Sequence, residues 1–397
     1  MDPRAHEPAG QGLHGLVAHD APAAQAAASA APRVAARVAF ALAAAVSLVS
    51  GIVGGLLRAG VAVPGDAAWM GHAVLAHAFL MMGGFLGTVI GLERAVAAKA
   101  PLAFAAPIAS ALAGLLALLG VAQAPWLMVV AALAFIAANA VVVSRQVALH
   151  TVLLLVGAGA WLVGNLLHAW RAQPAAVVPW WFSFLILTIA AERLEMTRLM
   201  RRRPGASTAL LFALGTLLAG SALFAISPRV GGVVYGLALL GLATWLLLFD
   251  VARRTVRARG LSRYMAVCLL LGYGWLAVAG LAWIAASLGV SARDVALHAL
   301  GLGFIFSMML AHGPVILPAL VRIKLQHGWP FYLPLALLHA SLLARLALAR
   351  FDTAWLARGA LGNSAAIVLF ALTIVGAALT WRRRHGTAPA ADRTPHR

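Results

Sequence analysis

Long apolar runs separated by short polar segments set the pattern of this chain. A helix needs about 20 apolar residues to cross a hydrocarbon core about 30 Å thick. About twelve segments have this length: 33–57, 68–92, 101–120, 124–143, 149–169, 177–197, 207–226, 230–251, 262–289, 295–320, 331–349 and 360–381. The pattern therefore predicts an all-α fold, a polytopic transmembrane helical bundle of about twelve helices.

The two ends of the chain lack this pattern. Residues 1–32 are rich in Ala, Pro, Gly and His without apolar periodicity, which predicts a disordered cytoplasmic tail. Residues 382–397 open with three arginines and continue as a polar stretch, which predicts a basic cytoplasmic tail. The transmembrane domain is expected to occupy residues 33–381.

Charge supports this class and orients the bundle. Only 10% of residues are charged and 63% are hydrophobic, yet the formal net charge is +19. The basic residues gather mainly in loops after even-numbered segments, so the positive-inside rule places both termini in the cytoplasm. We expect a multi-pass protein of the bacterial cytoplasmic (inner) membrane, surrounded by lipid. Nucleic-acid binding is excluded, because burial of the helices leaves no basic and aromatic surface.

Four histidines are candidate cofactor ligands, since ionisable side chains at membrane depth mark functional sites. The expected orientation places His72, His77 and His298 in the outer half of the bilayer and His312 near the cytoplasmic side. The single cysteine, Cys268, excludes a thiolate zinc site or an iron-sulfur cluster. Any metal would have to be held by histidine or by a cofactor.

Helix geometry restricts which histidines can cooperate. His72 and His77 would point about 140° apart on a regular helix, and His298 and His312 would lie about 21 Å apart along one. The favoured pair is therefore His77 facing His298 from another helix, as the two metal ligands. Opposed imidazoles are what a six-coordinate haem iron requires, and copper also binds imidazole.

Two Glu-Arg pairs end the second and sixth segments at the expected cytoplasmic side. They are Glu93-Arg94 and Glu192-Arg193. Adjacent residues point apart on a helix, so each side chain is expected to pair with a neighbouring helix rather than with its twin. The favoured interpretation is a set of structural ion pairs, and the alternative is a site of proton entry or substrate gating.

Two segments of the chain resemble the NnrS family of polytopic haem- and copper-containing membrane proteins. HAFLMMGGFLGTVIG, which begins at His77, resembles the family segment HEMLFGFxxAVIxGF. ALHALGLGFIFSMMLAHGPVILPAL, which contains His298, resembles ALHALxxGxxGxMxLAxMTRxxLGH. His77 and His298 match family histidines, whereas Ala78 replaces the glutamate of HEM and His312 is displaced from the family position.

The resemblance implies a twelve-helix bundle distantly related to the catalytic subunit of haem-copper oxidases. It also implies a role in the response to nitric oxide and nitrosative stress or in respiratory metabolism, with nitric oxide-related or respiratory-chain partners. The departures from the family pattern favour one bound haem without catalysis.

Two other functions remain open on sequence. One is a secondary transporter coupled through Glu93 and Glu192, since twelve helices are usual in permeases. The other is a non-catalytic assembly subunit of a respiratory complex. The sequence shows no nucleotide-binding loop or catalytic triad that would assign an enzymatic reaction.

Overall fold

The computed structural model describes residues 21–98, 100–196, 204–321 and 323–385, and within these ranges the chain is helical without strands. Twelve helical spans in this part of the chain are long and apolar enough to cross a membrane, which confirms the predicted fold class. They are Ala39–Arg58, His77–Ala98, Pro101–Leu118, Ala124–Arg145, Leu149–Ala169, Pro174–Met196, Ala206–Ile226, Pro228–Phe249, Leu261–Ser287, Arg293–Pro318, Trp329–Arg350 and Ala354–His385.

Several spans are built from more than one helical element. The α-helices are α1 (Ala21–Arg58), α2 (Ala68–Leu75), α3 (His77–Phe79), α4 (Thr88–Ala98), α5 (Ala105–Leu118), α6 (Ala124–Arg145), α7 (Leu149–Ala169), α8 (Pro174–Met196), α9 (Ala206–Ile226), α10 (Pro228–Phe249), α11 (Ala252–Thr255), α12 (Leu261–Ser287), α13 (Arg293–His298), α14 (Ser307–Val321), α15 (Tyr332–Ala347) and α16 (Ala354–His385). Two π-helices, η1 (Leu80–Gly87) and η3 (Ala299–Phe306), join α3 to α4 and α13 to α14. Three short 3₁₀ turns complete the chain: η2 (Pro101–Phe104), η4 (Trp329–Phe331) and η5 (Leu348–Arg350).

Helices extend into both of the predicted tails. Helix α1 begins at Ala21, so residues 21–32 are helical rather than part of a disordered tail. This stretch is rich in alanine, which favours a helix without the hydrophobicity that a membrane span needs. Helix α16 continues through the arginine run to His385. Residues 1–20 and 386–397 of the two predicted tails lie outside the described residues.

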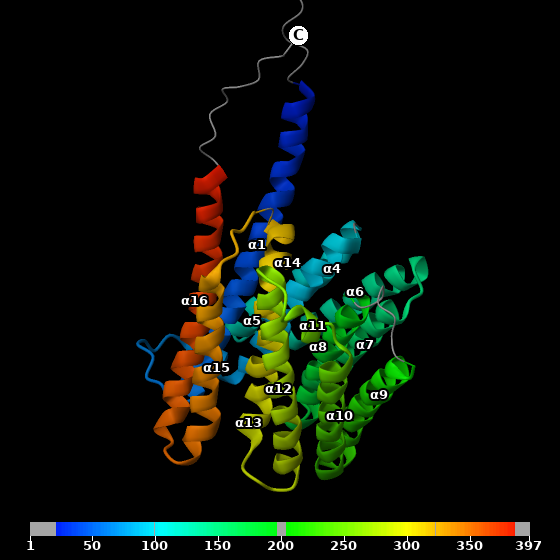
Figure 1. The fold of residues 1–397 in the computed structure, drawn as a ribbon, viewed down its shortest axis with the longest axis vertical. Helices are drawn as coiled ribbons and strands as arrows, with labels where there is room; N and C mark the ends of the chain where they lie inside the picture. Colours follow the sequence, from blue (N-terminus) through cyan, green and yellow to red (C-terminus); the bar gives the residue numbers. More distant parts are fainter. Residues whose placement is uncertain (1–20, 99, 197–203, 322, 386–397) are drawn as a thin grey trace, which may run out of the picture.

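The spans run along one common direction, and the start of α1 and the end of α16 lie at the same end of the bundle (Figure 1). We call this the terminal end and the opposite one the distal end. Helices α7 and α8, α9 and α10, and α15 and α16 pack as neighbouring pairs. The span formed by α8 is the most enclosed, with 67% of its apolar window buried, whereas α16 has 22%. Helix α8 therefore lies at the centre of the bundle.

The second span is not one continuous helix, contrary to the predicted segment 68–92. Helix α2 ends at Leu75, the backbone of Ala76 leaves the helical region, and the chain then passes through α3 and η1 into α4. The tenth span has the same construction, with η3 between α13 and α14. Each π-helix begins within three residues of a candidate ligand, His77 or His298. Such distortions of a helix are frequent at functional sites.

Glycines allow close packing on the second span. A Cβ atom at Gly83 would lie 2.5 Å from the Met128 side chain, and one at Gly87 would lie 2.7 Å from the Trp161 ring. The glycine face is therefore a packing surface against α6 and α7.

Candidate functional site

His77 and His298 are both held through ring atom Nδ1. His77 Nδ1 lies 2.7 Å from the Gly51 carbonyl oxygen of α1. His298 Nδ1 lies 2.9 Å from Asp294 Oδ1 and 3.1 Å from the Asp294 carbonyl oxygen. Because oxygen acceptors face Nδ1 in both rings, the neutral imidazoles carry their proton there and present the Nε2 lone pair. This is the form in which histidine binds a metal through Nε2.

Asp294 connects His298 to an arginine of another span. Arg345 of α15 donates from Nε to Oδ2 at 3.1 Å and from a terminal nitrogen to Oδ1 at 2.8 Å, which is a bidentate pair. The charges of His77, His298 and Arg345 are close enough to interact. We call His77, Asp294, His298 and Arg345 the distal histidine site. The structure thus brings His77 and His298 within electrostatic range of each other, and their role as metal ligands stays a prediction.

The other two histidine candidates lie apart from this site and from each other. His72 Nδ1 lies 2.8 Å from the Leu118 carbonyl oxygen of α5, whereas His77 faces α1. His72 and His77 therefore contact different helices. His312 belongs to α14, toward the terminal end, where its Nδ1 lies 2.7 Å from the Met308 carbonyl oxygen.

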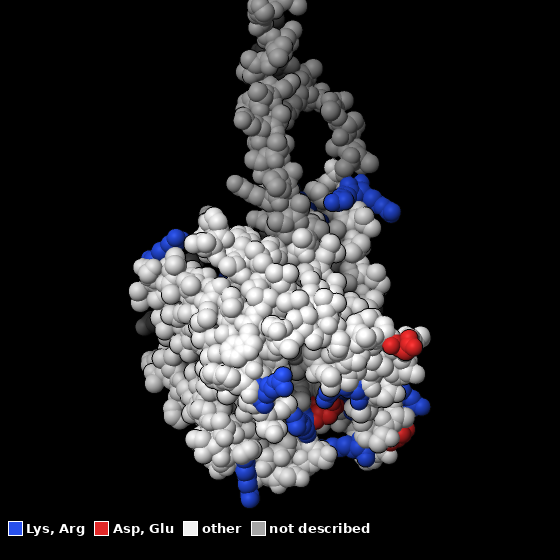
Figure 2. Space-filling model, turned by 180° about the vertical axis from the view of Figure 1, so that it is seen from behind, with Lys and Arg blue, Asp and Glu red and all other residues white. Residues whose placement is uncertain are grey.

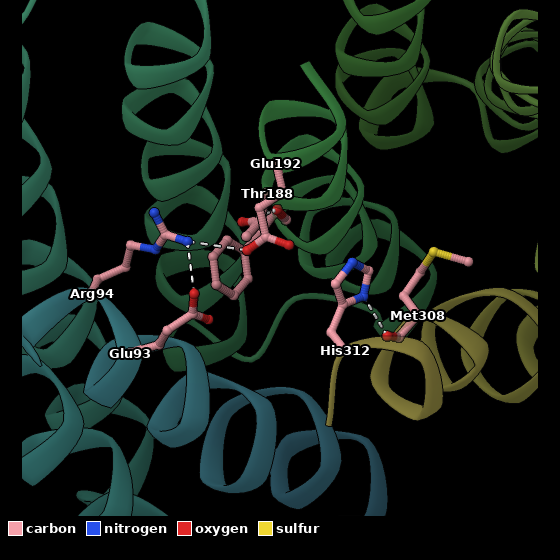
Figure 3. A network of polar contacts seen from close by, with 7 residues as sticks. Glu93, Arg94, Thr188, Glu192, Met308 and His312 are labelled. Carbon is pink, nitrogen blue, oxygen red and sulfur yellow. Dashed lines mark hydrogen bonds and ion pairs between the residues drawn. The ribbon is translucent and has the colours of Figure 1, made fainter. Parts of the chain in front are cut away.

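Arg94 of α4 contacts two glutamates, Glu93 of the same helix and Glu192 of α8 (Figure 3). One of its terminal nitrogens donates to Glu93 Oε1 at 3.0 Å and to Glu192 Oε1 at 3.1 Å. The predicted interhelical contact to α8 is present, but the expectation that adjacent Glu93 and Arg94 would not pair is wrong. The two side chains are long enough to turn toward each other, and a single guanidinium nitrogen serves both carboxylates.

Arg193 has a different charged partner from its neighbour Glu192. Its Nε lies 4.0 Å from Asp250 Oδ2, and the two side chains are only 3% and 1% exposed. The other carboxylate oxygen of Asp250 accepts from the Ala252 backbone N–H at 2.7 Å. Tyr273 of α12 is fully buried beside this pair. A buried arginine and a buried aspartate therefore neutralise each other next to α8.

His312 lies between these two ion-pair groups. Its charge is close enough to interact with Glu93, Arg193 and Asp250, and its ring lies on the side of Glu192 away from Arg94 (Figure 3). Its Nε2 atom is buried and has no hydrogen-bond partner among the described residues. We call Glu93, Arg94, Glu192, Arg193, Asp250 and His312 the terminal charge cluster.

Within the described ranges, no three His, Cys, Asp or Glu side chains are grouped so that they would hold a metal ion. A copper site built from protein ligands alone needs such a group. His77 and His298 provide two imidazoles, which is the number that a six-coordinate haem iron takes from a protein.

The sequence reasoning missed Asp294, Arg345 and Asp250. Two signals pointed to them: Asp294 stands four residues before His298, and Arg345 interrupts the apolar eleventh segment. A charge inside a membrane span requires a partner. What the sequence does not show is that α15 lies against α13, which brings the two residues together.

Comparisons with known proteins give one match. No curated protein and no solved structure matches the chain. The model of the family described as "Domain of unknown function (DUF8744)" matches residues 37–379, which is most of the chain, and the chain therefore belongs to this family.

Proposed function

We propose that this integral membrane protein binds a haem between His77 and His298, in the distal half of the bundle. The observation that carries the proposal is that both imidazole rings have the same hydrogen-bonding arrangement. Each ring donates its Nδ1–H to a protein oxygen and keeps the lone pair on Nε2. The carboxylate of Asp294 holds Nδ1 of His298 and so orients the ring as a ligand. A bound haem would supply a redox-active iron whose potential depends on these ligands and on the surrounding polarity.

Haem is favoured over copper for two reasons. Two protein ligands are sufficient for a haem iron, and no group of three metal-binding side chains occurs in the part of the chain that the structure describes. The resemblance to the NnrS family also supports haem, and it is the basis for extending the proposal to the response to nitric oxide or nitrosative stress.

The test is a visible absorption spectrum of the full-length protein, freshly isolated from cells supplied with haem, together with iron analysis. We expect a Soret band and stoichiometric iron, both lost in His77→Ala and His298→Ala. The matched control is His72→Ala, which should keep the band because His72 bonds to α5 and lies outside the distal histidine site. Absence of haem from the purified protein, or a band that survives both ligand substitutions, would overturn the proposal.

A second candidate function is proton-coupled secondary transport. It is favoured by Arg94 and its two glutamates, which lie largely buried inside a bundle of twelve spans. In this function Glu93 and Glu192 would couple ion movement to substrate movement. The same spectrum separates the two candidates, because a transporter of this kind has no Soret band.

A further inference from the structure

The terminal charge cluster joins residues from four parts of the bundle, and a fifth, α12, packs beside it. Glu93 and Arg94 come from α4, Glu192 and Arg193 from α8, and His312 from α14. Asp250 directly follows α10, and Tyr273 of α12 lies beside it. Helix α14 contacts α4 and α12, and α10 contacts α8 and α12. The helices that carry these groups therefore pack against one another.

The charges of this cluster do not cancel when His312 is neutral. Three carboxylates, those of Glu93, Glu192 and Asp250, face two arginines, Arg94 and Arg193. Half-buried Glu195 of α8, which also interacts with Arg94, adds further negative charge. An uncompensated charge is costly in a buried site, so these described groups favour the uptake of a proton.

His312 has the geometry of the group that accepts this proton. Its Nδ1–H donates to the Met308 carbonyl oxygen, so the lone pair is on Nε2. That atom is buried, lacks a hydrogen-bond partner in the described ranges, and belongs to a ring that interacts with Arg193, Glu93 and Asp250. The Nε2 atom of His312 is thus available to accept a proton inside the cluster.

The positions of Glu93 and His312 correspond in the two distorted spans. Thr88 directly follows η1 and Ser307 directly follows η3, and each hydroxyl donates to a carbonyl oxygen four residues earlier. Glu93 and His312 each stand five residues further along. The two spans therefore bring an acid and a base to the same position after the π-helix, toward the terminal end of the bundle.

We propose that the terminal charge cluster is a proton-binding site that takes up one proton, held on His312 Nε2 or on the Glu93–Glu192 carboxylate pair. In transfer between these positions, the O–H bond of a glutamic acid breaks and an N–H bond forms at Nε2, which leaves a carboxylate and an imidazolium. Arg94 stabilises the carboxylate that remains. The inference stands apart from haem binding, since it uses none of the residues of the distal histidine site.

The test follows protonation in the full-length protein in lipid nanodiscs. Histidine labelled with ¹³C and ¹⁵N reports ring protonation by nuclear magnetic resonance, and His312→Gln identifies the His312 signal. Infrared difference spectra between acidic and alkaline pH report protonated carboxyl groups. We expect one of two signals: titration of His312, or a carboxylic acid band that disappears in Glu93→Gln and Glu192→Gln.

The glutamate variants show whether His312 and the glutamates bind the proton as one site or titrate independently. If His312 holds the proton, Glu93→Gln should lower its titration midpoint by about one pH unit, a tenfold loss of proton affinity, because a neighbouring negative charge is removed. Asp66→Asn is the matched control, since Asp66 lies in the loop between α1 and α2, and it should leave the midpoint unchanged. The inference is overturned if neither signal occurs between pH 5 and 9, or if His312 titrates identically in Glu93→Gln, Glu192→Gln and wild-type protein.

Discussion

In each of the four candidate histidines, Nδ1 faces an oxygen atom of the protein. Three of the acceptors are backbone carbonyls alone, and His298 also has the Asp294 carboxylate. Imidazoles protonated on Nδ1 therefore occur at both ends of the bundle, but their neighbours differ. At the distal end His77 has another histidine nearby, and at the terminal end His312 has carboxylates nearby. At the residue scale, these different neighbours are the basis for proposing ligand binding by His77 and His298 and proton binding by His312.

Asp294 is expected to stabilise the distal histidine site as well as orient it. In Asp294→Asn, Arg345 keeps a partner of the same shape but loses the opposite charge. Because Arg345 is only 9% exposed, water can replace little of the lost interaction on its side. The Asp294 side chain is 42% exposed, so water compensates part of the loss. We expect the free energy of unfolding to fall by about 1–3 kcal/mol, measured on haem-free protein in detergent. Equal stability of this variant and wild type would show that the bidentate pair contributes nothing.

At the element scale, the two spans that carry the candidate ligands are the two that contain π-helices. A π-helix shifts the hydrogen-bonding register, and the hydroxyls of Thr88 and Ser307 bond to carbonyl oxygens where the α-helix resumes. Both spans therefore change the direction of their side chains between the distal site and the terminal cluster. Each of these spans therefore contributes one residue to the distal histidine site and another to the terminal charge cluster, although the two sites lie against different helices.

Close helix packing predicts a sharp difference between two glycines of α9. A Cβ atom at Gly220 would lie 2.7 Å and 2.8 Å from backbone atoms of Tyr235 on α10, whereas one at Gly215 would meet nothing within 4 Å. Gly220→Ala should therefore cost about 1–3 kcal/mol of stability, because α9 and α10 must separate. Gly215→Ala should be neutral or stabilise by up to about 1 kcal/mol, since alanine favours a helix. Thermal unfolding of the two variants in one detergent checks this, and equal midpoints would contradict it.

The apolar pattern was sufficient to predict the spans but not their internal distortions. Twelve runs of spanning length predicted twelve spans, because the bilayer thickness fixes the length that each needs. The break at Ala76 and the two π-helices were missed, since every residue there is compatible with a regular helix. The pairing of Asp294 with Arg345 was missed for another reason. It depends on which spans are neighbours, and hydrophobicity along one span carries no such information.

At the scale of the whole molecule, the two polar sites lie toward opposite ends of the bundle. A broad band without charged atoms crosses the face seen in Figure 2, and basic and acidic atoms gather near a hollow at the distal end. The band has the character of a lipid-facing surface. The distal histidine site and the terminal charge cluster are therefore expected to exchange with different sides of the membrane.

The positive-inside rule predicts which side each site faces, with the terminal end cytoplasmic. Cysteine labelling tests this cleanly, because the single native cysteine, Cys268, is fully buried. Phe351→Cys introduces a thiol in the exposed distal loop before α16, and Val147→Cys does so between α6 and α7. In right-side-out membrane vesicles, an impermeant maleimide should label only the Phe351→Cys variant.

The Val147→Cys variant should react once the vesicles are opened with detergent. The reverse pattern would place the terminal charge cluster near the external side, and its proton would then be exchanged with the external medium.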